Sequence, residues 1–557
     1  RVEGGNALAP HDPGASSARV LARLDAYASA WARDRHASCE AALARPDDRE
    51  LELRTSCLRR AGAHFEALVG ALAQADAAVA ERALTATTQL PELERCHDLE
   101  RLRAEDGPAV EPELEPAAEA LRASLAEVSA LLTAGRIDAA LERADACVEQ
   151  AQGIDHPPLL AEALWWQAHV RRIAGWLEPV LPGLEQAAHT AAAHGHDKVA
   201  ALAAVELTTV LGALARYDEA LEWSRHAEAA ARRFGEDRYP LARALASRGT
   251  VLRQLGRNEE SYQLYLEALR VQQRADAASH ELPTILNNLG TAALGLGRNE
   301  EALEHYARSY ERIEALLGPE HPQTAAARMN LGIVTAELGR HEEARAHYEA
   351  AREVFVRRFG PRDQRVAYCD TNLGNLLQSL RRHEQARERF AAARDLFAET
   401  LGPSHPNTAT ARASWGLTQI ELGNPEQALL AIEQALADTT AAVGPEHPFV
   451  GVMKGQTGQA LLALHRPAEA RERLQAAVEL LEQASADPSL LDEARFHLAR
   501  ARWELGERAE AWDEASAVRE RLAEHGPAVA REDVDAWLRA HPRGDDATEL
   551  GPTTDAR

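Results

Sequence analysis

The sequence predicts an all-α protein: a right-handed α-solenoid of about ten helix–turn–helix hairpins, preceded by a helical region. The chain of 557 residues is rich in Ala, Leu, Glu and Arg, which favour helix. The segments LGRNEEA, LGRHEEA, LRRHEQA and LGNPEQA combine turn residues with acidic residues at a helix start. A glycine recurs at steps of 42 residues, at Gly290, Gly332, Gly374, Gly416 and Gly458.

A second set of repeating positions is expected on the second helix of each hairpin. Alanine follows each glycine by 12 residues, a large apolar residue follows by 16 and a small residue by 19. Residues three and four apart share one helix face, so each set forms a stripe that lets two helices approach closely. The sets are Ala302, Tyr306 and Ser309; Ala344, Tyr348 and Ala351; Ala386, Phe390 and Ala393; Ala428, Ile432 and Ala435; and Ala470, Leu474 and Ala477.

Weaker copies of the pattern extend it in both directions and set the expected boundaries. We expect a linker or disordered segment at 1–15, an N-terminal helical region at 16–110 and the repeat superhelix at 116–525. A helix at 526–541 would cap the last apolar face, and 542–557 would be a disordered tail.

The N-terminal region is expected to contain two helices joined by the turn RPDD, Arg45–Asp48. Cys39 and Cys57 each lie nine residues from Asp48, so they would lie opposite each other in an antiparallel hairpin. Two interpretations stay open. The pair forms a disulfide in an oxidising compartment, or both are small buried apolar residues.

These repeating residues resemble the tetratricopeptide repeat (TPR). The connections GPEHP, GPSHP and GPEHP, at Gly318, Gly402 and Gly444, are similar to those of 42-residue kinesin light chain repeats. The resemblance implies a superhelix that binds proteins or extended peptides on its concave side. Arg381 and His465 depart from the pattern by replacing a turn glycine, and GPRDQ at Gly360 lacks HP.

The front end resembles the segment that precedes TPR arrays in large bacterial serine/threonine protein kinases. This resemblance implies a kinase domain before Arg1, with a membrane anchor as a further option, and it leaves the compartment unassigned. The alternative is the TPR region of another signalling protein, such as a transcription regulator. The matching residues are Trp31, Cys39, Cys57, Leu58, Leu90, Pro91, Cys96, Asp98 and Leu99.

Composition and motifs exclude several classes of function. A net charge of −25 argues against a general nucleic-acid binder, because phosphate affinity comes mainly from Lys and Arg. No apolar run approaches the roughly 20 residues that cross a bilayer. Phosphate loops and kinase catalytic motifs are missing, so we expect no enzyme activity and no cofactor. His321, His405 and His447 occupy equivalent repeat positions and would not converge on a metal, so we expect them to form hydrogen bonds within loops or helix caps.

The resemblance to TPR proteins implies that the residue two positions before each glycine faces the concave groove. At that position stand Asn288, Asn330 and Asn372. Their side-chain amides can both donate hydrogen bonds to and accept them from a peptide backbone of any sequence. The alternative is that the asparagines bond neighbouring hairpins and no ligand. Trp165, Trp166 and Trp176 are more typical of core packing than of a ligand platform. The flanking candidates for the groove are Thr284, Asn287, Tyr368, Asn375 and Gln378.

Overall fold

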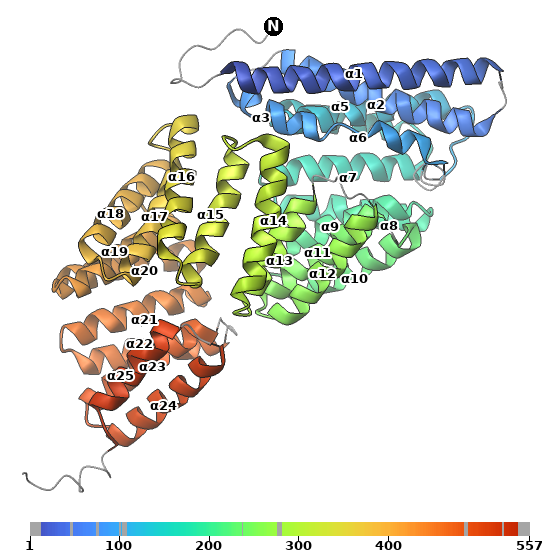
Figure 1. The fold of residues 1–557 in the computed structure, drawn as a ribbon. Helices are drawn as coiled ribbons and strands as arrows, with labels where there is room; N and C mark the ends of the chain where they lie inside the picture. Colours follow the sequence, from blue (N-terminus) through green and yellow to red (C-terminus); the bar gives the residue numbers. More distant parts are fainter. Residues whose placement is uncertain are drawn as a thin grey trace, which may run out of the picture. The chain divides into compact units, whose positions relative to one another are not determined.

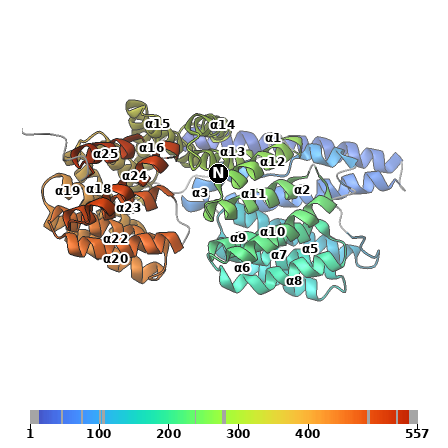
Figure 2. The same cartoon turned by 90° about the horizontal axis from the view of Figure 1, so that it is seen from below.

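The computed structural model describes residues 13–543, except 45–47, 74–76, 100, 101, 103–107, 237, 276–280, 484–487, 526 and 527. Throughout these ranges every regular element is a helix, as predicted (Figures 1 and 2). The chain divides into two compact units. The first comprises Arg1–Ala292 and Glu311–Gly318, and the second comprises Ala293–Tyr310 and Pro319–Arg557. Most of the linker expected at 1–15 and most of the tail expected at 542–557 lie outside the described residues.

Over its described residues, the N-terminal region contains three α-helices and a short 3-10 helix. They are α1 (Pro13–Ala44), α2 (Arg49–Ala73), α3 (Ala77–Thr88) and η1 (Leu93–His97). Of the expected turn at Arg45–Asp48 only Asp48 is described, and its carboxylate accepts a hydrogen bond from the backbone N–H of Glu50 (3.0 Å) at the start of α2. The long helices pack closely, because the indole of Trp31 on α1 lies directly over Gly62 on α2.

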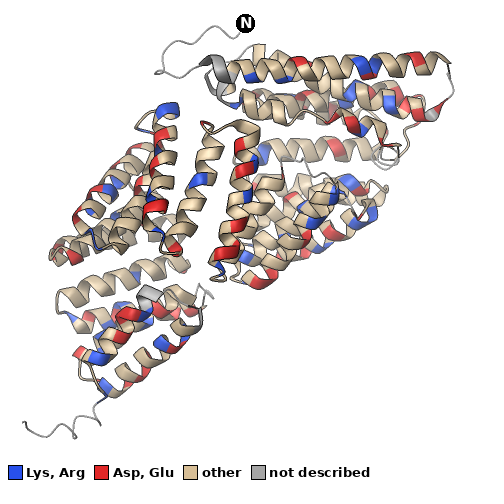
Figure 3. Ribbon diagram, in the orientation of Figure 1, with Lys and Arg blue, Asp and Glu red and all other residues tan. Residues whose placement is uncertain are grey.

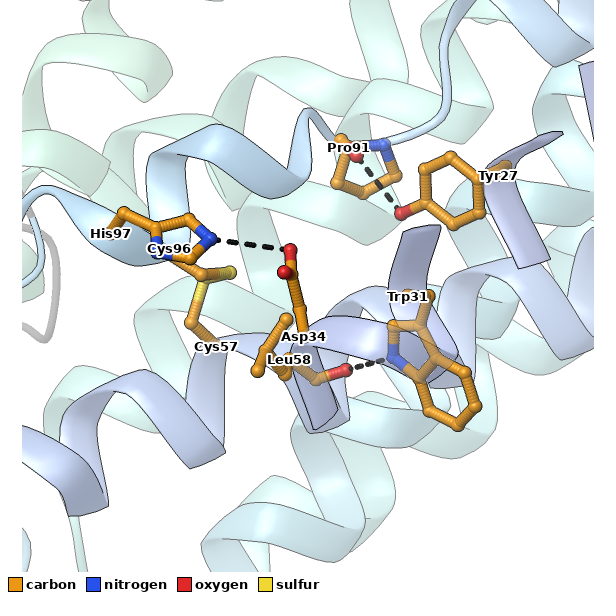
Figure 4. Close-up of a disulfide and its surroundings, with 8 residues drawn as sticks. All are labelled: Tyr27, Trp31, Asp34, Cys57, Leu58, Pro91, Cys96 and His97. Atoms are coloured by element: carbon orange, nitrogen blue, oxygen red, sulfur yellow. Dashed lines mark hydrogen bonds and ion pairs between the residues drawn. A yellow bond between two sulfur atoms is a disulfide. The ribbon is translucent and has the colours of Figure 1, made fainter. Parts of the chain in front are cut away.

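The disulfide of this region differs from the expectation. Cys57 is bonded to Cys96 of η1, across 39 residues of sequence (Figure 4). Cys39 is a free, exposed thiol. The pairing of Cys39 with Cys57 was wrong because opposite places along two helices do not set which way each side chain points. Cys39 faces solvent on α1, whereas η1 folds back onto α2 and brings Cys96 to a Cα–Cα distance of 5.6 Å from Cys57.

Ten helical hairpins follow within the described residues, and a final helix succeeds them. The predicted number of repeats is therefore confirmed. The first helix of each hairpin is given before the second: α5 (Glu115–Thr133) and α6 (Ile137–Gln152); α7 (Pro157–Ile173) and α8 (Leu181–Ala193), with the 3-10 turn η2 (Glu178–Val180) between them; α9 (Asp197–Ala213) and α10 (Tyr217–Phe234); α11 (Tyr239–Gln254) and α12 (Asn258–Ala275); α13 (Leu282–Leu294) and α14 (Asn299–Leu317); α15 (Pro322–Glu337) and α16 (His341–Phe359); α17 (Gln364–Ser379) and α18 (His383–Thr400); α19 (Pro406–Glu421) and α20 (Pro425–Val443); α21 (Pro448–Ala463) and α22 (Pro467–Gln483); α23 (Pro488–Glu504) and α24 (Arg508–His525); and lastly α25 (Ala528–Ala540).

The repeating glycines lie where the two helices of a hairpin are closest. A Cβ atom on Gly374 would lie 2.7 Å from the ring of Phe390, which is fully buried on α18. The small residues on either side of that ring, Ala386 and Ala393, are also fully buried. The equivalent glycines at 332, 416 and 458 meet Tyr348, Ile432 and Leu474 in the same way. The predicted small–large–small stripe therefore forms the core of each of these hairpins.

A left-handed residue ends the first helix of every hairpin, and three of these residues carry a side chain. Arg381 and His465, each with φ of 55°, keep the turn conformation where the repeat otherwise has glycine. The backbone N–H of Arg382 donates to Leu377 (2.8 Å) and that of Arg381 to Gln378 (2.9 Å), which satisfies the last carbonyls of α17. The left-handed residues are Gly135, Gly175, Ala215, Gly256, Gly297, Gly339, Arg381, Gly423, His465 and Gly506.

The histidines of the connections cap the helices that follow them, as expected. The Nδ1 atom of His321 accepts the backbone N–H of Gln323 (3.2 Å) at the start of α15. Burial lowers the pKa of His321 to about 4, so the ring is neutral at pH 7 and Nδ1 can accept. His405 and His447 cap α19 and α21 in the same way. Asp363, where the sequence lacks HP, accepts from the backbone N–H of Arg365 (2.9 Å).

Helix α25 covers the last hairpin. Val534 and Leu538 on α25 are buried against Ala499 of α23 and against Val518 and Leu522 of α24. The apolar face that a terminal repeat leaves open is thus covered in this part of the chain. None of the described helices combines the length and the apolar character that crossing a membrane requires.

Candidate functional site

The candidate residues of the second unit lie on helices α15 and α17. A Cβ on Gly374 would point at Phe390 of the second helix α18. Asn372 comes two residues earlier, which is about 200° around the helix at 3.6 residues per turn, so its side chain leaves the opposite side of α17. The same relation holds between Asn330 and Gly332, whose Cβ would meet Tyr348 of α16. Both asparagines therefore point away from the second helix of their hairpin.

Exposed polar side chains surround Asn372 on α17. Asn372 is half-buried, Asn375 is exposed and Gln378 is half-buried. Over the ranges that the structure describes, none of these three amides has a hydrogen bond to another residue. Asn330, in contrast, is half-buried and interacts with another residue of the protein.

Tyr368 provides an apolar surface one turn before Asn372. Its side chain is 40% exposed, a large fraction for a tyrosine on a packed helix. The ring meets Phe397 of α18 edge-on at 4.9 Å, and its hydroxyl accepts a hydrogen bond from the Nδ2 of Asn407 on α19 (2.5 Å). Two neighbouring helices therefore hold Tyr368 in place while leaving one side of its ring open. Sequence reasoning missed Asn407, although it directly follows the HP of the connection GPSHP.

The remaining candidates lie in the first unit, on helix α13. Thr284 is exposed there, and Asn287 and Asn288 are half-buried. Asn287 engages another residue of the protein. The predicted set is therefore divided between two units: α13 carries Thr284, Asn287 and Asn288, and the second unit carries Asn330, Tyr368, Asn372, Asn375 and Gln378.

Charged residues four positions before the glycines pair within the protein. Asp370, almost fully buried on α17, accepts from Arg352 Nε (3.0 Å) and from Arg389 Nη1 (2.8 Å). At the equivalent place on α19, Arg412 forms an ion pair with Asp438 of α20. These internal pairs leave amides, hydroxyls and one aromatic ring as the exposed groups around Asn372. Sequence reasoning missed both pairs, whose only signal is a charge at a fixed distance from the glycine.

Acidic and basic side chains alternate along the helices of each unit (Figure 3). Within the described ranges, His, Cys, Asp and Glu side chains form no group of three or more that could hold a metal ion.

The comparisons with known proteins identify the repeat. The tetratricopeptide repeat family matches residues 281–356 and 363–441. No curated protein matches the sequence. Among solved structures, BtubC (BKLC) from P. vanneervenii is 21% identical, covering 41% of this chain and 91% of its own, with a TM-score of 0.34. A Rap protein complexed with Competence and Sporulation Factor is 16% identical, covering 71% and 99%, with a TM-score of 0.44. A putative kinesin light chain from Podosopora anserina is 18% identical, covering 37% and 99%, with a TM-score of 0.32.

The family match lies on the hairpins in which the 42-residue step, the buried stripe and the left-handed turns recur most regularly. The repeats at residues 281–356 and 363–441 are therefore tetratricopeptide repeats, and they recur with a period of 42 residues.

Proposed function

We propose that this chain is an interaction scaffold that binds an extended segment of a partner protein along the first helices of its hairpins. Repeat proteins of this kind present long surfaces made of equivalent helices. The observation that carries the proposal is the set of accessible polar groups on α17 around Asn372, which itself points away from α18. On this helix Asn372, Asn375 and Gln378 have no hydrogen bond to another described residue, and the ring of Tyr368 is partly open.

The chemistry of this surface favours a peptide backbone as the ligand. An amide donates and accepts at once, so Asn372 matches the alternating N–H and C=O groups of an extended strand. Tyr368 would contact an apolar side chain of the same segment, since rigid aromatic residues make effective anchors. Asn288 and Asn330 would make the equivalent backbone contacts on their own helices. Asp370 and Arg412 are satisfied internally, which favours a segment without strong charge.

The test is capture of partners by the chain with Asn288, Asn330 and Asn372 changed together to Ala. The matched control changes Gln385 and Gln427 to Ala, because these exposed amides lie at equivalent positions on the second helices α18 and α20. Bait immobilised at equal density is exposed to a lysate of the source cells, and captured proteins are quantified by mass spectrometry. We expect the triple variant to lose captured proteins that the control variant retains, with unchanged helicity by circular dichroism. Capture of the same proteins in the same amounts by both variants would refute the proposal.

We further propose that the scaffold is the recognition region of a serine/threonine protein kinase. Supporting this, residues that carry the resemblance of the front end gather around one disulfide (Figure 4). The Nε1 of Trp31 donates to the carbonyl of Leu58 (2.7 Å), beside the bond between Cys57 and Cys96. Sequencing the gene upstream of the codon for Arg1 tests it. Kinase catalytic motifs there are the expected result, and a DNA-binding domain would favour a transcription regulator instead.

A further inference from the structure

A cavity of about 340 Å³ lies in the first unit, away from the asparagine-bearing helices. Its walls come from α2 and η1 of the N-terminal region and from α5, α7 and α9, the first helices of three successive hairpins. These three helices lie next to one another (Figures 1 and 2). Both cysteines of the disulfide, Cys57 and Cys96, line the cavity, so a covalent bond ties two of its walls together. The volume is in the range of small-molecule sites.

Basic side chains converge on this cavity from four different elements. Arg60 belongs to α2, Arg95 to η1, Arg122 to α5 and Lys198 to α9. Two acidic residues, Glu92 and Glu162, also line it, so four formal positive charges face two negative charges. A local excess of positive charge stands out in a chain whose net charge is −25.

The carboxylate of Glu162 is already engaged by protein groups. His196 Nε2 lies 3.0 Å from its Oε1. Burial alone would raise the pKa of Glu162, but the hydrogen bond from His196 and the nearby charges of His196, Arg122 and Lys198 lower it. In the described part of the chain, Arg122 and Lys198 have no hydrogen-bonded partner. Their hydrogen-bond donors are therefore available to a ligand.

Two buried nitrogen atoms in the same wall also lack partners. The Nε2 of His64 and the Nε1 of Trp165 have no hydrogen-bond partner among the described residues, and their side chains are 8% and 9% exposed. Burial lowers the pKa of His64 to about 4, so its ring is neutral at pH 7. A buried indole N–H without an acceptor is costly, and such groups are rare in native proteins. Both residues line the cavity, and a bound molecule that reached these two nitrogen atoms would satisfy them.

We propose that this cavity binds a small organic anion, with its carboxylate or phosphate group against Arg122 and Lys198 and its apolar part against Trp165 and Trp166. Guanidinium and ammonium groups match such oxyanions, and the two indoles, whose rings meet edge-on at 4.8 Å, supply the apolar wall. The Nε1–H of Trp165 donates to an oxygen of the ligand. This site is independent of peptide binding along α13, α15 and α17.

The test titrates the full chain with inorganic phosphate, citrate or adenosine monophosphate at constant ionic strength and follows binding by calorimetry and tryptophan fluorescence. We expect adenosine monophosphate to bind saturably, and citrate and phosphate, which have no apolar part for the two indoles, to bind more weakly. Changing both Arg122 and Lys198 to Gln removes two charge-assisted contacts and should weaken binding roughly tenfold or more. The control variant, Arg345→Gln with Arg387→Gln, removes two basic groups from surface ion pairs of the second unit and should bind normally.

A second variant tests the same proposal in case the first variant misfolds. Trp165→Phe keeps a ring in the wall and deletes the unpartnered N–H, so it should also weaken binding while circular dichroism stays unchanged. The proposal is overturned if no probe binds saturably up to about 10 mM, a concentration that detects even weak sites. It is equally overturned if the Gln variant binds like the unchanged chain, or if the control variant loses binding as well.

Discussion

Two glycines on one helix give a sharp test of how the hairpins pack. Gly458 and Gly455 both lie on α21. A Cβ on Gly458 would lie 2.4 Å from Cγ of Leu474, which is fully buried on α22. A Cβ on Gly455 would lie 3.9 Å from the Cβ of Ala477 and 4.0 Å from that of Ala494, which is ordinary van der Waals contact. Replacing each glycine by alanine therefore separates close packing from helix propensity.

The expected free energies follow from these distances. Each substitution gains about 1 kcal/mol of helix propensity. Only Gly458→Ala also forces Leu474 to move within a packed core, which costs about 1–3 kcal/mol. The propensity gain cancels between the two variants, so Gly458→Ala should be about 1–3 kcal/mol less stable than Gly455→Ala. We expect Gly455→Ala to stabilise α21 relative to the unchanged chain.

Long repeat arrays need not unfold in one step, so the measurement should be local. Hydrogen exchange followed by mass spectrometry on peptides from α21 and α22 reports the opening of this hairpin. We expect exchange there to be about fivefold or more faster in Gly458→Ala than in Gly455→Ala. Equal protection in the two variants, or greater protection in Gly458→Ala, would refute the assignment of this glycine to close helix packing.

Three further predictions concern the thiols, a turn and a buried carboxylate. Iodoacetamide should modify Cys39 alone in the native chain; unfolding without reductant should expose three thiols, and adding reductant five. His465→Gly should raise the urea midpoint, because a left-handed side chain costs about 1–2 kcal/mol and the glycine's extra freedom in the unfolded chain offsets only part of that. Although burial alone would raise the pKa of Glu206, the hydrogen bond from His169 and the charges of His169, Arg172 and Arg243 lower it to about 2. Because the pKa of Glu206 is depressed in the folded protein, its ionised carboxylate stabilises the fold above pH 4.5. That stabilisation is lost as the pH falls towards 2, so the free energy of unfolding of the unchanged chain should fall by about 3 kcal/mol more than that of Glu206→Gln.

Each of these three predictions has a control or an outcome that would contradict it. Modification of Cys57 or Cys96 in the native chain, or five thiols after unfolding without reductant, would contradict the disulfide. Gly423→Ala, at the equivalent turn of the neighbouring hairpin with φ of 78°, should lower the urea midpoint. An unchanged midpoint in both turn variants would contradict the strain argument. Acid titrations with the same slope for the unchanged chain and Glu206→Gln would show that Glu206 contributes nothing to acid sensitivity.

The sequence predicts the hairpins well because their geometry is local. The period of an α-helix places Gly374 opposite Asn372, so the direction of the asparagine follows once the glycine is assigned to the contact with Phe390. The histidine caps could also be expected, because each residue bonds the backbone only two positions later. Asp363 caps α17 in place of a histidine, because its carboxylate also offers a hydrogen-bond acceptor at the first turn of the helix.

Contacts between distant segments were not predictable in this way. The partner of Cys57 depends on how η1 folds back onto α2, and helix spacing contains no information about that. The cavity near Trp165 draws its walls from elements spread along the whole first unit, and no motif joins them. Trp165 is buried, as expected for a core residue, and it also lines the cavity. The same expectation was wrong for Trp176, which is 48% exposed. Binding by Asn288, Asn330 and Asn372 stays a prediction.

The left-handed residue that closes every first helix has a consequence for how such a chain changes length. Since each junction has the same backbone conformation, excising one whole 42-residue period between Gly339 and Arg381 would rejoin equivalent ends. Duplication of a period would do the same. Whole repeats can therefore be added or deleted during evolution, provided that α25 still covers the apolar face of the last hairpin.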